Sequence, residues 1–457
     1  MSSDNYSLNG TQTADLNTAG GIRSAIDAVK PRPRTDKQIW GIYIALVLVS
    51  LVELYSASSR EIVSGHVLEP LLRHGFFLGI GFLIMIGLQR VHYLRFYRMT
   101  YVIVFLCIVA TVYTMFFGLY INGARRAFSL FGLCTVQPSE LIKFSAALVL
   151  ARYLCHYKAR YARGHEVEQR ENNQRLVWTS AITVLIFGVL LIKQGLTNTI
   201  IMMVISWAMM IIGAIRIREL AKVMLVYVLL AGGYAVYKYG GLEDKLFPET
   251  EVAVNADGTP ASELEVDRSA THQNRLKEWW RSDKYKDTIT SRNSQEQYAY
   301  IAQANGGLFG KFPGNSRETA RLPLAFSDYI YAIIIEDTGL VGGIALMLLY
   351  LWLLARAGRI ALQCKKSYPA LLVIGMAVFI VCQALMHMGI VTGFFPVSGQ
   401  PLPLISKGGS SIIITSVALG IMLSVSRFAL RKGVKQEANE KLSELSDKDM
   451  LDNPTQF

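Results

Sequence analysis

Charged residues are scarce in this chain. Asp, Glu, Lys and Arg make up 18% of its 457 residues, whereas 52% are hydrophobic. Soluble domains carry about 25% charged residues, and here apolar runs near 20 residues recur along most of the sequence. Runs of that length can cross the hydrocarbon core of a bilayer as helices. The composition therefore predicts an all-α polytopic membrane protein rather than a soluble enzyme.

Cysteine is rare too, and the common catalytic signatures are missing. The five cysteines are scattered, with neither a metal-ligand spacing nor a disulfide framework. The sequence contains no HExxH segment and no nucleophile elbow. Gly306 to Lys311 resembles a phosphate loop only faintly, because its spacing is short and no strand is expected before it. The lone His387 is interpreted as a packed or hydrogen-bonded histidine rather than a ligand.

The net charge of +12 could point to nucleic acid. The Lys and Arg residues, however, cluster in short loops between the apolar runs, which is the positive-inside pattern of membrane proteins. We therefore expect contact with membrane lipids and no nucleic-acid partner.

The apolar runs divide the chain into three parts. Residues 1–38 are polar and then basic, which predicts a disordered cytoplasmic tail without a cleaved signal peptide. Ten spans are predicted in residues 39–427, and a cytoplasmic C-terminal tail is predicted in residues 428–457. Residues 240–326 form one large polar loop, expected outside the cytoplasm between spans seven and eight. The predicted spans are 39–57, 74–88, 99–118, 138–155, 177–192, 199–215, 223–239, 327–355, 369–392 and 411–425.

One stretch joins a polar, glycine-rich half to an apolar half with three acids. The apolar half starts at Ser327 and contains Asp328, Glu336 and Asp337. On a helix, one face would carry Asp328, Ala332, Glu336, Gly339 and Gly343. Acids in a membrane helix are costly and should face an interior cavity. Two interpretations of Asp328 stay open: a functional site at the mouth of the helix, or a simple cap of its N-terminus together with Ser327.

Several cations also lie at or near the membrane. Arg125 and Arg126 fall in a loop predicted to be outside, where two guanidiniums suit a phosphate or pyrophosphate. Contact with lipid headgroups or a local ion pair is the alternative. Glu140 and Lys143 are spaced to pair within span four, since a lysine in a span needs a partner or a ligand. Lys407 is a further cation expected on the outer side.

Together these motifs resemble the SEDS family, the membrane proteins of bacterial shape, elongation, division and sporulation. The matching blocks are NGARR (Asn122 to Arg126), QPSELIK (Gln137 to Lys143), ANGGLFGKFPGNS (Ala304 to Ser316), LPLAFSDYIYAIIIEDTGLVGG (Leu322 to Gly343) and GFFPVSGQPLPLISKGGSS (Gly393 to Ser411). The likeness covers about residues 39–427. The last block and the SVSR segment (Ser424 to Arg427) look more like the division branch, FtsW, than the elongation branch, RodA.

The resemblance implies a peptidoglycan glycosyltransferase of the bacterial inner membrane at the division septum. Its substrate would be lipid II, an undecaprenyl-pyrophosphate-linked disaccharide pentapeptide. Its partners would be a class B penicillin-binding protein transpeptidase and other division proteins. No cofactor is certain, and a divalent cation is an open candidate without a visible ligand set. The family's essential aspartate falls on Asp328, and the candidate substrate-binding residues are Arg125, Arg126, Glu140, Lys143, Glu336, Lys407 and Ser410.

The chain departs from the family pattern near these residues. Phe326 and Ser327 replace the histidine and threonine that precede the essential aspartate. Ala127 stands where a tryptophan often follows the arginines, and Ser398 where many division-branch proteins carry a lysine. The alternatives to a division polymerase are an elongation-type polymerase, a transporter that flips lipid II, and a scaffold without chemistry.

Overall fold

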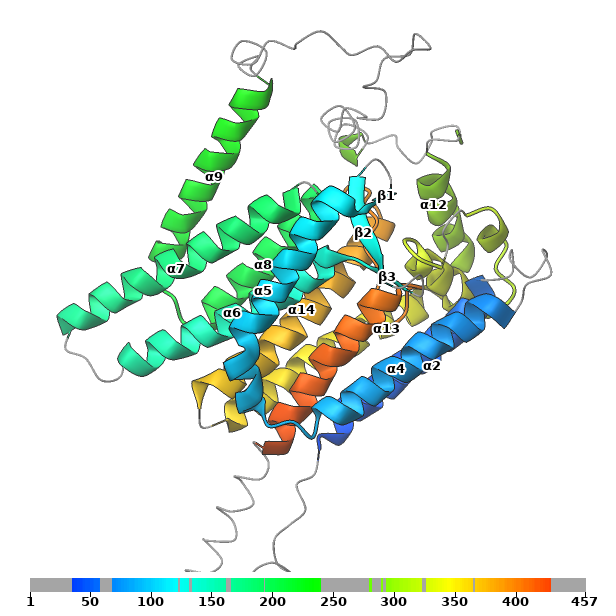
Figure 1. Cartoon of the computed structure of the whole chain (residues 1–457). Helices are drawn as coiled ribbons and strands as arrows, with labels where there is room; N and C mark the ends of the chain where they lie inside the picture. Colours follow the sequence, from blue (N-terminus) through cyan, green and yellow to red (C-terminus); the bar gives the residue numbers. More distant parts are fainter. Residues whose placement is uncertain are drawn as a thin grey trace, which may run out of the picture.

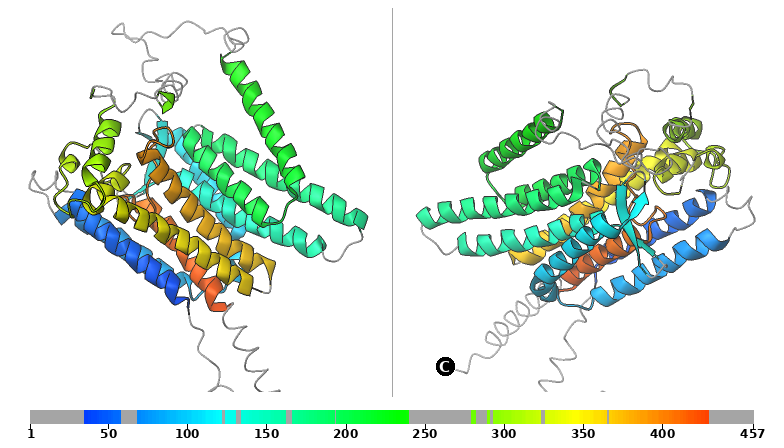
Figure 2. Two further views of the ribbon diagram at one scale, coloured as in Figure 1. Left: turned by 180° about the vertical axis from the view of Figure 1, so that it is seen from behind. Right: turned by 45° about the horizontal axis from the view of Figure 1, so that its top comes forward.

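The computed structural model is a bundle of long helices with a small sheet and a helical segment at one end (Figures 1 and 2). It describes residues 35–57, 68–121, 124–130, 134–161, 166–192, 194–239, 279–281, 289–290, 293–322, 326–364 and 366–428. Nearly all of the predicted N-terminal tail, the predicted C-terminal tail beyond residue 428 and most of the large loop lie outside the described residues. The predicted character of those parts stays a prediction.

Ten helices in the described part of the chain coincide with the ten predicted spans. They are α2 (Lys37–Ala57), α4 (Leu68–Leu88), α5 (Tyr93–Phe117), α6 (Pro138–Tyr161), α7 (Glu166–Ile192), α8 (Leu196–Ile212), α9 (Ile217–Tyr239), α13 (Ile330–Gln363), α14 (Ser367–Val391) and the last helix (Gly409–Phe428). Seven of these are long and apolar enough to cross a membrane, and α8 is apolar but has 17 residues. The chain is a polytopic helical membrane protein, as predicted; the number of spans stays a prediction.

The two C-terminal spans form the centre of the bundle. In their apolar segments 72% of α14 and 83% of the last helix are buried, whereas only 22% of α5 is. α14 packs against α6, α8 and α13. Figure 1 shows α2 and α4 side by side at one edge of the bundle, with α7 and α9 towards the opposite edge. The peripheral helices expose apolar side chains because their surroundings are expected to be lipid rather than water.

A three-stranded antiparallel sheet stands where the sequence predicted a plain loop between spans three and four. β1 (Leu119–Ile121) pairs with β2 (Ala124–Leu130), which pairs with β3 (Cys134–Val136). β1 and β3 have only three residues each, and the seven residues of β2 (ARRAFSL) do not alternate between apolar and polar, so the sequence does not distinguish the sheet from a loop. Pro138, whose ring suits a first helical position, begins α6 directly after the sheet.

α13 is interrupted inside its apolar run. Gly339 has φ 74° and ψ −178°, which is not helical. The prediction that Asp328, Glu336 and Gly339 share one continuous helix face is therefore wrong. The helix also begins only at Ile330, after Asp328. Glycine permits this backbone conformation, whereas other residues adopt it rarely.

The segment Gly307–Phe312, hereafter the glycine loop, pairs the backbone groups around this break. It follows α12 (Ser294–Gly306). The bonds are Leu340 N–H to Gly307 O (2.9 Å), Val341 N–H to Leu308 O (3.2 Å), Lys311 N–H to Glu336 O (2.9 Å) and Phe312 N–H to Asp337 O (2.8 Å). A Cβ at Gly310 would lie 2.2 Å from Asp337 O, so only glycine allows this approach. Irregular backbone near a membrane is stable when such partners satisfy it.

Candidate active site

Asp328 lies at the mouth of α13, in the turn just before the helix. Its Oδ1 accepts a hydrogen bond from Ser327 Oγ (3.1 Å). The N-cap of α13 is Tyr329, and no side chain makes a capping hydrogen bond. The interpretation of Ser327 and Asp328 as a simple helix cap is therefore wrong. Asp328 is half-buried, so its carboxylate is partly shielded but not sealed in.

The loop between α14 and the last helix, residues 393–408, is fastened to this turn. Lys407 N–H donates to Phe326 O (2.9 Å), and Ser406 Oγ donates to Ser327 O (2.7 Å). A Cβ built on Gly399 would lie 2.7 Å from Asp328 Oδ2, so the bare glycine backbone faces the carboxylate. The loop thus forms one wall of the site.

Two cations are associated with the turn that carries Asp328. The Lys407 ammonium lies 4.2 Å from the centre of the Phe326 ring, two residues before Asp328. Arg126 on β2 is close enough for its charge to act on Asp328. Successive residues of a strand point to opposite faces, so Arg125 and Arg126 cannot grip one phosphate as a parallel pair at this point. The charge of Arg126 acts on Asp328, whereas Arg125 pairs with Tyr120 in the register of β1 and β2.

The electrostatics of Asp328 suit a base. Burial raises the pKa of the Asp328 carboxyl above its ordinary value, while the Ser327 hydrogen bond and the charge of Arg126 oppose this rise. A carboxylate with a raised pKa binds a proton more strongly, and the charge of Arg126 favours its ionised form. A general base needs both properties.

Lys143 and Glu140 pair inside the bundle, as predicted from their spacing. Lys143 Nζ donates to Glu140 Oε1 (2.6 Å), and neither side chain is more than 2% exposed. Gln383 Nε2 on α14 donates to Glu140 Oε2 (2.7 Å). The pair is therefore sealed between α6 and α14 and does not line the open face beside Asp328.

This buried pair is linked to the wall of the site through Gln400. Lys143 Nζ lies 3.5 Å from Gln400 Oε1, and His387 Nδ1 lies 2.6 Å from Gln400 O. Gln400 directly follows Gly399, which faces Asp328. The interpretation of His387 as a packed, hydrogen-bonded histidine is confirmed. The network holds the 393–408 loop where it meets Asp328.

The structure separates Glu336 from Asp328. Glu336 is fully buried, and its carboxylate accepts hydrogen bonds from Ser316 Oγ, Arg317 N–H (3.1 Å) and Glu318 N–H (3.4 Å). Lys311 Nζ lies 3.9 Å from it. These protein groups occupy the carboxylate, so Glu336 fixes the chain between the glycine loop and α13.

The other candidates are less closely tied to Asp328. Ser410 lies in the first turn of the last helix and is 7% exposed. Among the described residues, no group of three or more His, Cys, Asp or Glu side chains is arranged to hold a metal ion. That part of the chain therefore has no set of ligands that fits a divalent cation.

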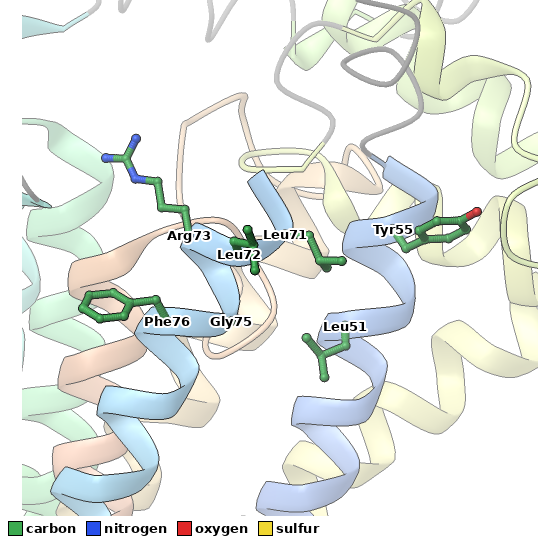
Figure 3. A pocket seen from close by; sticks show the side chains of 7 residues that line it. All are labelled: Leu51, Tyr55, Leu71, Leu72, Arg73, Gly75 and Phe76. Atoms are coloured by element: carbon green, nitrogen blue, oxygen red, sulfur yellow. The ribbon is translucent and has the colours of Figure 1, made fainter. Parts of the chain in front are cut away.

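A groove of about 1060 Å³ lies between α2 and α4. It is lined by Leu51, Tyr55, Leu71, Leu72, Arg73, Gly75 and Phe76. Figure 3 shows Leu51 and Leu71 between the two helices, whereas the Tyr55 ring lies on the side of α2 away from α4, and Arg73 and Phe76 lie on the side of α4 away from α2. None of the predicted site residues lines this groove, and its apolar wall suits a hydrocarbon chain better than a sugar.

Comparison with known proteins identifies the family of this chain. The family model of the FtsW, RodA and SpoVE cell cycle proteins matches residues 36–431. This chain belongs to that family. The predicted SEDS resemblance is confirmed, and it covers nearly the whole described bundle.

Two bacterial relatives align along most of their lengths. The probable peptidoglycan glycosyltransferase FtsW of Burkholderia thailandensis is 28% identical over 433 residues, which cover 89% of this chain and 82% of the relative. The stage V sporulation protein E of Bacillus subtilis is 26% identical over 397 residues, covering 85% of this chain and 96% of the relative.

Solved structures show the same fold. A chain from a peptidoglycan synthase complex that coordinates polymerization and crosslinking matches with a TM-score of 0.61 and 23% identity, covering 86% of this chain and 98% of its own. The rod shape determining protein RodA of Thermus thermophilus matches with a TM-score of 0.56 and 22% identity, covering 86% and 97%.

Some residues of the site were not predicted from the sequence. Gly399 and Gln400 belong to a loop some 70 residues after Asp328, and no local pattern indicated the contact. Gln383 gave a usable signal, because a polar side chain in an apolar run marks the interior of a bundle. Ser56, which donates to the Asp337 carboxylate, gave none.

Proposed function

We propose that this chain is a peptidoglycan glycosyltransferase that joins lipid II units into glycan strands, with Asp328 as the general base. Family membership and the names of the relatives support glycan polymerisation. The observation that carries the role of Asp328 is its setting, a half-buried carboxylate at a helix mouth that faces the Gly399 backbone and feels the charge of Arg126.

In the proposed reaction Asp328 removes the proton from a sugar hydroxyl of the acceptor. That oxygen attacks the anomeric carbon of the donor and forms the new glycosidic bond. The bond between the anomeric carbon and the lipid pyrophosphate breaks, and the lipid pyrophosphate leaves with the electron pair. Attack opposite the leaving group inverts the configuration at that carbon.

The leaving pyrophosphate gains negative charge, which nearby cations stabilise. Arg126, whose charge acts on Asp328, and Lys407, which lies over the Phe326 ring, take this role, with Arg125 and Ser410 as further substrate contacts. Lys143 and Glu140 are sealed inside the bundle, so their contribution is to hold Gln400 and the 393–408 loop. Glu336 contributes by fixing the segment before α13.

The partner and the location follow the same proposal. A class B penicillin-binding protein would cross-link the strands, which is supported by the fold shared with a chain of a complex that coordinates polymerization and crosslinking. The chain would act in the bacterial inner membrane at the septum, with ten spans, both tails in the cytoplasm and Asp328 at the outer surface. Fusions of a compartment reporter after residues 165 and 260 should then report opposite sides.

The test uses purified protein with its transpeptidase partner in liposomes that contain lipid II. Glycan chains and transfer of lipid II across the bilayer are scored separately. The proposal predicts glycan formation whenever lipid II is present on the Asp328 side. Lipid crossing without glycan would favour the transporter, and absence of both under conditions that support a related polymerase would favour the scaffold.

A further inference from the structure

Two polar contacts tie α2 to α13 at opposite ends. At one end Arg356 Nε donates to Asp36 Oδ2 (2.8 Å). At the other end Ser56 Oγ donates to the Asp337 carboxylate and accepts from Gly314 N–H (3.0 Å). The two helices pack against each other between these contacts.

The length between the ties matches a membrane. The apolar part of α2, Lys37–Ser56, has 20 residues, and Asp337 to Arg356 is also 20 residues. Helical residues rise about 1.5 Å each, so the α2 segment spans about 29 Å. The α13 segment, which is helical apart from the break at Gly339, packs beside it. The hydrocarbon core of a bilayer is about 30 Å thick. The tie at Ser56 and Asp337 therefore marks one membrane boundary.

The glycine loop lies at this boundary. Its hydrogen bonds reach Glu336 and Asp337 at the tie, and Leu340 and Val341 about one turn deeper into the span. Four backbone hydrogen bonds and the close approach of Gly310 fix its depth. The loop therefore cannot move away from the membrane without breaking contacts to α13.

The loop exposes large apolar side chains at that depth. Leu308 is 61% exposed, Phe309 78% and Phe312 72%. Its charged residue, Lys311, forms an ion pair with Glu336. A water-facing loop rarely presents such an apolar patch, and aromatic rings concentrate at membrane interfaces. The patch continues onto the exposed lipid-facing residues Leu340 and Val341 of α13.

We propose that the glycine loop is embedded in the membrane surface, with Leu308, Phe309 and Phe312 among the lipid acyl chains. The occupant of this face is the bilayer, because the patch is continuous with the lipid-facing side of α13 at the depth set by both ties. The glycine loop and the end of α12 are thereby anchored at a fixed height. This inference depends on the chain being a membrane protein and not on its proposed chemistry.

Photo-crosslinking in native membranes tests the occupant. p-Benzoylphenylalanine replaces Phe309 or Phe312 in the full-length chain, and Asn315, an exposed residue three positions further on, is the matched control. Illumination should give phospholipid adducts at positions 309 and 312, at least about fivefold more than at 315, by intact-protein mass spectrometry. Crosslinks mainly to another protein would overturn the proposal and identify a partner surface.

Cysteine labelling provides a second, independent measurement. Phe309→Cys and Asn315→Cys are treated in intact membranes with a water-soluble, membrane-impermeant maleimide, and the unsubstituted protein gives the background of the native thiols. The maleimide reacts with the thiolate, which forms readily only where the thiol is in water. We therefore expect labelling at position 315 to be at least about tenfold faster than at position 309. Equal rates in membranes, with equal rates after denaturation, would contradict insertion.

Discussion

Asp328 and Glu336 lie eight residues apart in one segment, yet their surroundings are opposite. Asp328 is half-buried, receives a hydrogen bond from the neighbouring Ser327, faces a bare glycine backbone and lies within the influence of the Arg126 charge. Glu336 is fully buried, and Ser316 and two backbone N–H groups bind its carboxylate. The comparison teaches that a membrane carboxylate is available for chemistry only when the protein has not already supplied its donors.

The sealed region should be the more sensitive to added volume. Gly339→Ala places a Cβ about 2.2 Å from Leu308 O at a positive φ, so we expect a loss of folding stability above about 4 kcal/mol and little monodisperse protein. Gly358→Ala in the same helix is the control, because nothing lies within 4 Å of a Cβ there. Yields are compared by size-exclusion chromatography in detergent. Equal yields would show that the contact between the glycine loop and the break is dispensable.

Glu336→Gln tests the same region through its hydrogen bonds. The amide cannot accept from all the donors that the carboxylate serves, so we expect a loss of about 1–3 kcal/mol in stability. Polymerisation per folded molecule should remain near the wild-type rate. The control is Glu219→Gln, where the surface pair with Lys222 contributes under about 1 kcal/mol. A polymerisation defect in Glu336→Gln at unchanged thermal stability would give Glu336 a chemical role.

The two arginines of β2 should differ. Arg126→Ala removes a cation whose charge acts on Asp328. A hydrogen bond to a charged group contributes about 1.5–3 kcal/mol, so we expect kcat/KM to fall at least about tenfold. Arg125→Ala points to the other face of the strand and should lose less. The comparison is made on lipid II polymerisation at matched protein levels. A larger loss for Arg125 would reverse the assignment of the two faces.

The smallest expected effect is a displacement of the pH profile. Asp328 must be ionised to act, and burial raises its pKa. Activity should therefore be full above the folded-state pKa and fall as the pH drops through it, at a higher pH than for an ordinary aspartate near 3.9. Arg126→Ala should move this acid limb higher still, because the arginine charge lowers that pKa. An acid limb at or below the ordinary value would contradict the burial of the base.

Much of the fold could be predicted from the sequence because membrane spans are recognisable as long apolar runs. It also predicted the Glu140 and Lys143 pair from helical spacing. The break at Gly339 was not predictable, since a glycine inside an apolar run usually continues the helix. The β-sheet was not predicted because β1 and β3 have only three residues each and β2 does not alternate between apolar and polar residues.

Asp328 was identified through the family resemblance, but its neighbours come from tertiary structure. The contact with Gly399 and the fastening of Lys407 to Phe326 join segments far apart in the chain. Equally, nothing in the sequence distinguished the open Asp328 from the sealed Glu336. That difference depends on the donors contributed by Ser316 to Glu318.

The most direct measurement is the rate of glycan formation by Asp328→Asn. The variant and the wild type are purified with the transpeptidase partner, placed in liposomes with lipid II and compared for thermal stability in the same preparation. The account predicts a rate lower by roughly 10²–10⁴-fold, the usual loss when a general base is removed, with unchanged stability. Glycan formation at the wild-type rate by a properly folded Asp328→Asn protein would contradict it.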